Sequence, residues 1–290
     1  MNYKMPTKAV LSDAGFASRY LPLTKTIPKS MIPMGAKPVM QLIVEECVEA
    51  GIKDIIIVAT ESGKPVYEDY FNNPVEKIKR LLKSQGKLDR FEPVKNVLDL
   101  ADITVITQDP DLPYGNGSPF ASARPYLNDD EAFIAIYSDD LVFGKSAVKN
   151  LMERFAEVPS ARVVTGVQEV KPEEIEKFSS VKFKEDGEEV ERIIEKPKME
   201  EAPSFLTSLG RNLLTPEIFK YLTPKETGKD GELWLADAMD KLARNEGGVY
   251  TSKLDGIWYT AGDPKNYALA YMKYILETDP SLAAEIKKLF

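Results

Sequence analysis

Residues 13–33 read Asp-Ala-Gly-Phe-Ala-Ser-Arg-Tyr-Leu-Pro-Leu-Thr-Lys-Thr-Ile-Pro-Lys-Ser-Met-Ile-Pro, a stretch with three prolines and three cations but neither helical nor strand periodicity. A short apolar run, Ala9-Val10-Leu11, precedes it and predicts a first strand. Apolar residues at helical spacing follow it over 39–50 and predict a first helix. The stretch is therefore a long loop from the carboxyl end of a strand to a helix, the place where open α/β sheets bind their ligands.

The side chains of this loop favour phosphate as a ligand. Arg19, Lys25 and Lys29 lie on backbone that neighbouring prolines hold at fixed φ, so the cations are presented with little loss of conformational entropy. A Rossmann dinucleotide fingerprint is excluded because it needs three glycines at G-x-G-x-x-G, and this turn has only Gly15. A Walker loop is excluded because no G-K-[ST] closes the segment. An ordinary proline-rich surface loop with solvated cations remains as the alternative.

Composition narrows the classes of partner. The chain has 290 residues, enough for one large α/β domain, and 43% of them are hydrophobic, as in an ordinary globular protein. With 38 basic and 46 acidic side chains the net charge is −8, which argues against a nonspecific nucleic-acid or anionic-membrane surface. A site for anionic nucleotides must therefore be locally basic.

The residue types that are missing exclude several kinds of chemistry. Histidine is absent, which removes Ser-His-Asp and Cys-His catalysis and histidine-based zinc sites. The single cysteine, Cys47, falls on the apolar face of the predicted helix, so a buried inert thiol is expected and no disulfide is possible. The amino terminus has no apolar signal region and no run approaches the length of a membrane span, so a cytoplasmic protein is expected.

Two further strand ends carry groups suited to a ligand. A strand over 103–107 leads into a loop with Gly115 and Gly117, which can bring backbone amides close to a ligand; a turn-rich surface loop is the alternative. A strand over 133–137 ends in Ser138-Asp139-Asp140. Adjacent carboxylates repel each other and a divalent cation relieves that cost, whereas the alternative is a polar strand end with Asp140 capping a turn.

The rest of the chain continues the alternation of strands and helices. Strands are predicted over 54–60, 161–168 and 206–214, a hairpin around Asp186-Gly187, and helices over 231–239, with Glu232 in the first turn, and over 264–277. Mixed helical patterns over 62–100 indicate peripheral helices. The expected fold is a three-layer α/β domain with a mixed, mostly parallel sheet.

The loop that opens the chain resembles the signature loop of the sugar-phosphate nucleotidyltransferases, above all the bacterial and archaeal UTP–glucose-1-phosphate uridylyltransferases. That family's pattern is G-x-G-T-R-x-x-P-x-T-K-x-x-P-K-x-x-x-P, in which Ala17 and Ser18 here replace a glycine and a threonine. The residues that match the pattern are Gly15, Arg19, Pro22, Thr24, Lys25, Pro28, Lys29 and Pro33. The resemblance covers roughly residues 8–278, with the motifs in family order.

The resemblance implies a role for residues along the whole chain. It implies one Rossmann-like nucleotidyltransferase domain over 1–290, with a nucleotide-binding half at 8–140 and a sugar-binding half at 141–290. Catalytic cations would be Arg19 and Lys29, and Asp139 would bind Mg²⁺. The nucleotide would be held by Ala14, Gly15, Gln108 and Gly115. The sugar phosphate would be held by Glu195 and Lys196 of an E-K-P-K motif, with Ser179 and Gly210.

The implied reaction is attack of a hexose-1-phosphate on the α-phosphorus of UTP, which yields a nucleoside-diphosphate sugar and pyrophosphate. Four departures from the family pattern, at Ala17, Pro119, Ser179 and Thr260, leave two alternatives open. One is a noncatalytic or regulatory protein that binds a sugar nucleotide. The other is a transferase with another base or sugar, such as a thymidylyltransferase. Family members are often dimers or tetramers, so the resemblance also leaves a homodimer and a homotetramer open.

Overall fold

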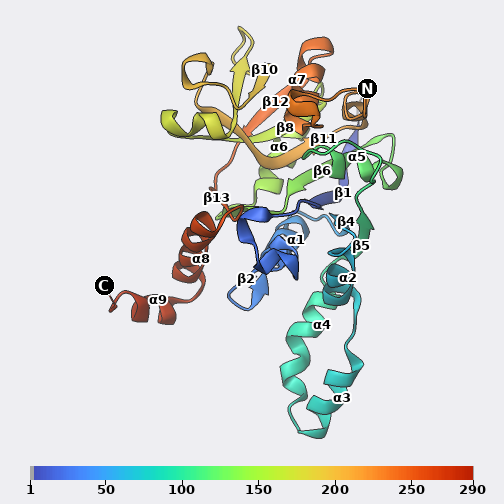
Figure 1. Ribbon diagram of the computed structural model, residues 1–290, viewed down its shortest axis with the longest axis vertical. Helices are drawn as coiled ribbons and strands as arrows, with labels where there is room; N and C mark the ends of the chain where they lie inside the picture. Colours follow the sequence, from blue (N-terminus) through green and yellow to red (C-terminus); the bar gives the residue numbers. More distant parts are fainter. Residues whose placement is uncertain (1–2, 290) are drawn as a thin grey trace.

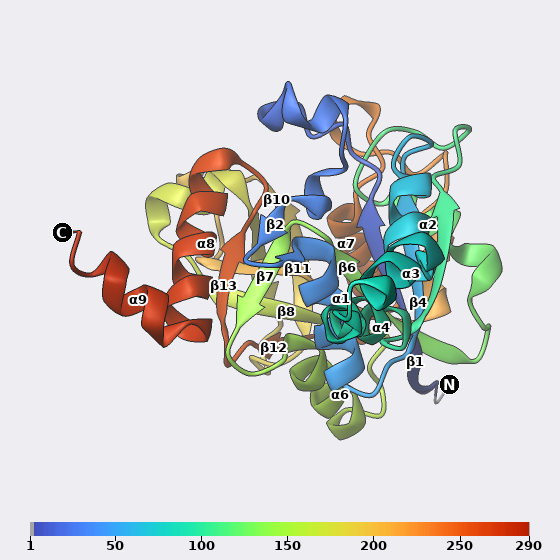
Figure 2. The same ribbon diagram turned by 90° about the horizontal axis from the view of Figure 1, so that it is seen from below.

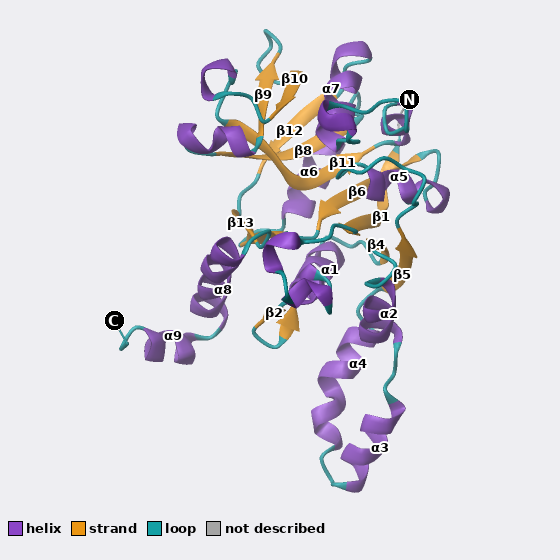
Figure 3. Ribbon diagram, in the orientation of Figure 1, coloured by secondary structure: helices purple, strands orange, loops and turns teal. Residues whose placement is uncertain are grey.

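A seven-stranded sheet forms the middle layer of the protein, in a computed structural model that describes residues 3–289 (Figures 1 and 3). Its strand order is β12-β8-β11-β6-β1-β4-β5. β11 runs antiparallel to both of its neighbours, and the other pairs in this sheet are parallel. The prediction of a mixed, mostly parallel sheet is therefore confirmed. The strands are β1 (Lys4–Asp13), β4 (Asp54–Ala59), β5 (Asp102–Thr107), β6 (Glu131–Tyr137), β8 (Val163–Glu169), β11 (Leu206–Leu214) and β12 (Val249–Lys253).

Helices cover both faces of the sheet, and the buried side chains of the central strands point to the two faces in turn. Ala9 and Leu11 of β1 pack on one side with α1 (Val39–Glu49), α2 (Lys64–Asn72) and α6 (Ala147–Glu157). Val10 packs on the opposite side with α5 (Ser118–Ser122) and α7 (Leu235–Asn245). Successive strand residues point to opposite faces, so a continuous apolar run buries both faces of the sheet at once. The three-layer α/β fold follows from this arrangement.

Smaller elements extend from this body. α3 (Glu76–Ser84) and α4 (Glu92–Leu98) form a projecting arm, and α8 (Pro264–Thr278) leads to α9 (Pro280–Ile286) near the carboxyl end (Figures 1 and 2). Three two-stranded ladders complete the structure: β9 (Ser179–Phe183) with β10 (Val190–Glu195), β7 (Asp140–Phe143) with β13 (Ile257–Thr260), and β2 (Pro33–Met34) with β3 (Lys37–Pro38). Cys47 is buried and unpaired, as expected. None of the described helices combines the length and apolar content that a membrane span requires.

The predicted helix over 231–239 begins later than expected. α7 starts at Leu235, so the prediction that Glu232 lies in its first turn is wrong. The cause is a long-range backbone contact: the Leu233 amide donates to the Tyr114 carbonyl (2.8 Å), and the Leu233 carbonyl accepts from the Gly117 amide (2.8 Å). The amide and carbonyl of Leu233 are paired with the turn at 114–117, so this residue does not contribute its backbone hydrogen bonds to the first turn of the helix.

Candidate active site

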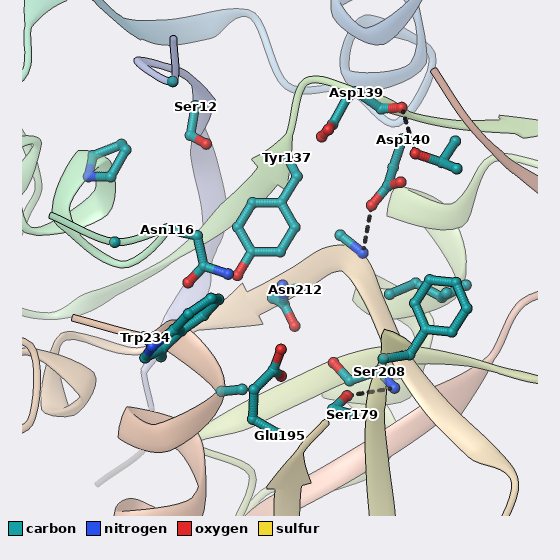
Figure 4. Close-up of a pocket in the computed structure, with 18 of the residues that line it drawn as sticks. Ser12, Asn116, Tyr137, Asp139, Asp140, Ser179, Glu195, Ser208, Asn212 and Trp234 are labelled. Carbon is teal, nitrogen blue, oxygen red and sulfur yellow. Dashed lines mark hydrogen bonds between the residues drawn. The ribbon is translucent and has the colours of Figure 1, made fainter. Parts of the chain in front are cut away.

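A cleft of about 460 Å³ lies at the edge of the sheet where β1, β5 and β6 end (Figure 4). Lys25 and Gly117, which the sequence also indicated, do not line its wall. The wall contains every residue to which the family resemblance gives a role in the site, although those residues come from distant parts of the chain. They are Ala14, Gly15, Arg19, Lys29, Gln108, Gly115, Asp139, Ser179, Glu195, Lys196 and Gly210. Their individual roles remain predictions, but the cleft brings them together in one place.

Asp139 and Lys29 form an ion pair in this cleft. The ammonium of Lys29 donates to Oδ2 of Asp139 at 2.7 Å. Burial by itself would lower the pKa of Lys29, but the carboxylates of Asp139 and Asp13 raise it above its ordinary value. Burial would likewise raise the pKa of Asp139, and the charge of Lys29 instead holds it below its ordinary value. Both side chains are therefore charged at neutral pH.

Asp140 lies behind this pair and differs from it chemically. Its Oδ2 accepts a hydrogen bond from the Gly210 amide at 3.1 Å. Burial, followed by the neighbouring charge of Asp139, raises the pKa of Asp140 to about 7. A Cβ on Gly210 would lie 2.2 Å from Oδ2 of Asp140, so no side chain fits at this position. Gly210 is therefore required by its contact with Asp140 and does not need a ligand to explain it.

The proline-rich loop is anchored to the sheet by hydroxyl groups. Ser30 donates to the Ser138 carbonyl at 3.0 Å, and Tyr20 donates to the Ala261 carbonyl at 2.6 Å. Ala17 adopts a left-handed conformation (φ 46°), which explains why the family pattern has a glycine there. The loop also exposes Arg19, which forms no ion pair among the described residues and lines the cleft. The cation is thus available to an anionic ligand.

Two predicted glycines in the cleft have different surroundings, and only one of them has no room for a side chain. A Cβ on Gly15 would meet no heavy atom within 4 Å, so this position opens into free space. A Cβ on Gly115, whose φ is +143°, would lie 2.2 Å from the carbonyl oxygen of Leu233. The amide of Gly117 donates to that same carbonyl, so it does not face a ligand as the sequence suggested. This turn therefore fits closely against the segment before α7.

Glu195 at the end of β10 and Lys196 after it form another part of the cleft wall. Burial raises the pKa of Glu195 above its ordinary value, although the nearby charge of Lys196 opposes this shift. The ammonium of Lys196 lies 3.8 Å from Oε1 of Glu195 and 4.4 Å from the ring centroid of Trp234. Lys196 itself has a left-handed backbone (φ 45°), a conformation that costs energy and is found most often at functional sites. Its ammonium is thus held at the cleft by a carboxylate and an aromatic face.

The side chains of Thr260 and Asp263 both accept hydrogen bonds from backbone amides close by in the sequence. The hydroxyl of Thr260, where the family pattern has a second metal-binding aspartate, accepts from the Gly262 amide at 3.1 Å and lines the cleft. Asp263 does not line it. Its carboxylate caps α8 by accepting from the amides of Lys265 (3.1 Å) and Asn266 (3.0 Å). Asp263 therefore does not replace the missing carboxylate in this structure.

Several cleft residues were not predicted from the sequence. Asn116 lies between the two glycines of its turn, a position that could have drawn attention, and its Oδ1 accepts from the Leu235 amide at 3.0 Å. Residues 231–239 resemble the family segment G-E-I-Q-L-T-D-A-I, and Trp234 stands where that segment has a glutamine, so its position was a visible signal. Tyr137, Ser208 and Asn212 lie in strands β6 and β11, and Lys177 ends a short 3₁₀ helix, Pro172–Lys177, so their spacing alone did not indicate a site. The unpredicted residues include Asn116, Tyr137, Lys177, Ser208, Asn212 and Trp234.

Comparison with known proteins places the chain in a class. A model of the nucleotidyl transferase family matches residues 8–277, and the chain belongs to this family of enzymes. Within the family the chain is similar to UTP–glucose-1-phosphate uridylyltransferases. UTP–glucose-1-phosphate uridylyltransferase 2 of Staphylococcus saprophyticus is 38% identical, over 97% of each chain. The uridylyltransferase of Bacillus subtilis is 36% identical, over 94% of this chain and 92% of its own.

Solved structures agree with this assignment. A UDP-glucose pyrophosphorylase in complex with UDP-glucose has a TM-score of 0.78 at 30% identity, covering 94% of this chain and all of that one. The UTP-bound enzyme from Acinetobacter baumannii has a TM-score of 0.84 at 28% identity, covering 98% of both chains. The resemblance read from the sequence is therefore confirmed, as is the nucleotidyltransferase fold.

Proposed function

We propose that this chain transfers the uridylyl group of UTP to glucose-1-phosphate, giving UDP-glucose and pyrophosphate, with a requirement for Mg²⁺. The observation that carries the proposal is that one cleft contains Arg19 and Lys29 of the first loop, Lys196 after β10 and the Asp139 carboxylate, which is paired with Lys29. The names of the similar proteins support the same reaction.

The chemistry of the step suits a chain without histidine. The phosphate oxygen of glucose-1-phosphate is already ionised at neutral pH, so no general base is needed. That oxygen forms a bond to the α-phosphorus of UTP as the bond to the β-phosphate oxygen breaks, and pyrophosphate leaves with the electron pair. Catalysis then consists of holding two mutually repelling anions together and neutralising the charge that develops.

Each residue of the cleft would bind a different part of the two substrates. Arg19, exposed and without an ion-pair partner among the described residues, would hold the leaving pyrophosphate, and Lys29 would hold the α-phosphate. Lys196 would bind the sugar phosphate while Glu195 accepts hydrogen bonds from the hexose. Gln108 would read the uracil edge, and the open space at Gly15 would let the nucleotide approach the backbone.

Asp139 fits a magnesium ion that takes its other ligands from substrate. No cluster of three acidic or cysteine side chains able to hold a metal exists within residues 3–289. Magnesium is commonly held by one or two carboxylates together with substrate phosphates and water, so the Asp139 carboxylate alone is an acceptable protein ligand. The hydroxyl of Thr260 lies 3.5 Å from the backbone carbonyl of Asp139 and lines the same cleft. When bound, the ion would neutralise charge on the phosphates.

Pyrophosphate release tests the proposal. Purified protein would be given each of the four common nucleoside triphosphates with glucose-1-phosphate and Mg²⁺, and Asp139→Asn would serve as the control. We expect turnover with UTP that the variant loses. Turnover with thymidine triphosphate in preference to UTP would redirect the assignment, and silence with a panel of sugar phosphates would favour the noncatalytic alternative.

A further inference from the structure

A chain of buried hydroxyl and amide groups crosses the floor of the cleft. The strand register places Asn212 of β11 directly opposite Thr165 of β8. The hydroxyl of Thr165 donates to Oδ1 of Asn212 at 2.7 Å, and Oγ of Ser208 lies 2.6 Å from the same hydroxyl. Thr165 has one hydroxyl hydrogen and gives it to Asn212, so Ser208 must donate to Thr165. Thr165 is fully buried and Asn212 is 1% exposed, so the direction of this chain is protected from water.

In the structure, Oδ1 is the end of the Asn212 amide that faces this chain of hydroxyl groups. Because Oδ1 faces Thr165, the NH₂ group of Nδ2 faces away from it, and Asn212 is one of the residues that line the cleft. No hydrogen bond from Nδ2 is found among the residues that the structure describes. Figure 4 shows Asn212 between Tyr137 and Glu195. Nδ2 is not one of the fully buried polar atoms that lack a partner, so it is open to the cleft, where an acceptor on a ligand can take the place of water.

We propose that Asn212 is a specificity-determining residue for the sugar, whose Nδ2 donates a hydrogen bond to a hydroxyl oxygen of the hexose, and that Thr165 is the positioning residue that holds the amide. The inference rests on the proposed function. Glu195, when ionised, can only accept hydrogen bonds, whereas Nδ2 of Asn212 can only donate. A hydroxylated, uncharged ring satisfies both groups. A uronic acid phosphate would place a second carboxylate near Glu195, so it is the disfavoured substrate class.

Binding of UDP-glucose and of UDP, measured by calorimetry, separates a sugar contact from a general structural effect. Asn212→Ala should weaken UDP-glucose binding by about tenfold, because one neutral hydrogen bond is lost, and leave UDP binding unchanged. Thr165→Val should act in the same direction, and Thr165→Ser, which keeps the hydroxyl, should restore wild-type binding. Thr104→Val makes the same chemical change at an exposed position of the edge strand β5 and should alter neither ligand.

Kinetics with deoxy analogues of glucose-1-phosphate identify the hydroxyl. In the wild-type chain each deoxy analogue should raise KM for the sugar, and the increase at the contacted position should disappear in Asn212→Ala, since enzyme and substrate then lack the same hydrogen bond. KM for UTP should not change. Thermal melts show whether each variant is folded, and Asn212→Ala suffices if Thr165→Val unfolds.

Three results would overturn the inference, each with a different meaning. Equal weakening of UDP and UDP-glucose binding in Asn212→Ala would make the residue structural. An unchanged penalty for every deoxy analogue would mean that Asn212 does not touch the sugar. Failure of the wild-type chain to bind UDP-glucose or to release pyrophosphate would instead refute the proposed function, and the sugar contact with it.

Discussion

The same substitution, glycine to alanine, should lower stability at one position of the cleft and ligand affinity at another. At Gly115 a Cβ would lie 2.2 Å from the Leu233 carbonyl oxygen on backbone with φ +143°. Forced overpacking costs about 1–3 kcal/mol and an unfavourable φ about 1–2 kcal/mol more, so the free energy of unfolding should fall by roughly 2–5 kcal/mol. At about 2 °C per kcal/mol for a chain of this size, Tm should drop by roughly 4–10 °C.

Gly15→Ala should leave stability within about 1 kcal/mol of wild type, because the added methyl group meets nothing within 4 Å. Its effect should appear in calorimetry with UTP, where a methyl group between backbone and nucleotide should weaken binding by about tenfold or more. Normal UTP affinity in Gly15→Ala would refute the placement of the nucleotide. A wild-type Tm in Gly115→Ala would refute the close contact with Leu233.

Three further perturbations have distinct expected outcomes. Ala17→Gly should raise the free energy of unfolding by up to about 1 kcal/mol, measured in urea, because it relieves the left-handed alanine; a loss would contradict this. Because the pKa of Asp140 is raised to about 7, the folded chain keeps a proton that the unfolded chain loses near pH 4, so stability falls as pH rises between about 4 and 7. Asp140→Asn should flatten that slope in unfolding measured at pH 5 and pH 8, and an unchanged slope would contradict the shift. Thr260→Asp adds a carboxylate beside Asp139, so its Tm should be lower without Mg²⁺ and rise more on adding Mg²⁺ than that of the wild type; an identical Mg²⁺ response would argue against a metal there.

Local patterns were sufficient for the main layers of the fold. The apolar run over 54–60 predicts a buried strand, and the apolar residues at helical spacing over 39–50 predict a helix with one buried face. The structure has β4 and α1 in those two ranges. The candidate site was also readable where its residues belong to long motifs, as with Arg19, Lys29 and Glu195. In each case the neighbouring residues in the sequence are also the neighbours that shape the element.

Features made by distant contacts were not readable in this way. α7 begins at Leu235 because Leu233 pairs with the turn at 114–117, a contact more than a hundred residues away along the chain. Asn212 becomes a cleft residue because β11 inserts between β6 and β8, which places it opposite Thr165. The residues next to Asn212 in the sequence do not determine which residue of β8 it pairs with. The contact between its amide oxygen and Thr165 is therefore seen only in the folded sheet.

The departures from the family pattern keep the backbone and change the side-chain chemistry. Ala17 takes the left-handed conformation that a glycine would take, and Thr260 accepts a hydrogen bond from the Gly262 amide. Asp139 and Lys29 remain paired and charged, so the electrostatic centre for phosphate is preserved. Under the proposed function the reaction depends on that centre, and under the proposed sugar contact the choice of sugar depends on groups such as Asn212. The departures should therefore be visible in metal affinity and sugar preference before they are visible in the class of reaction.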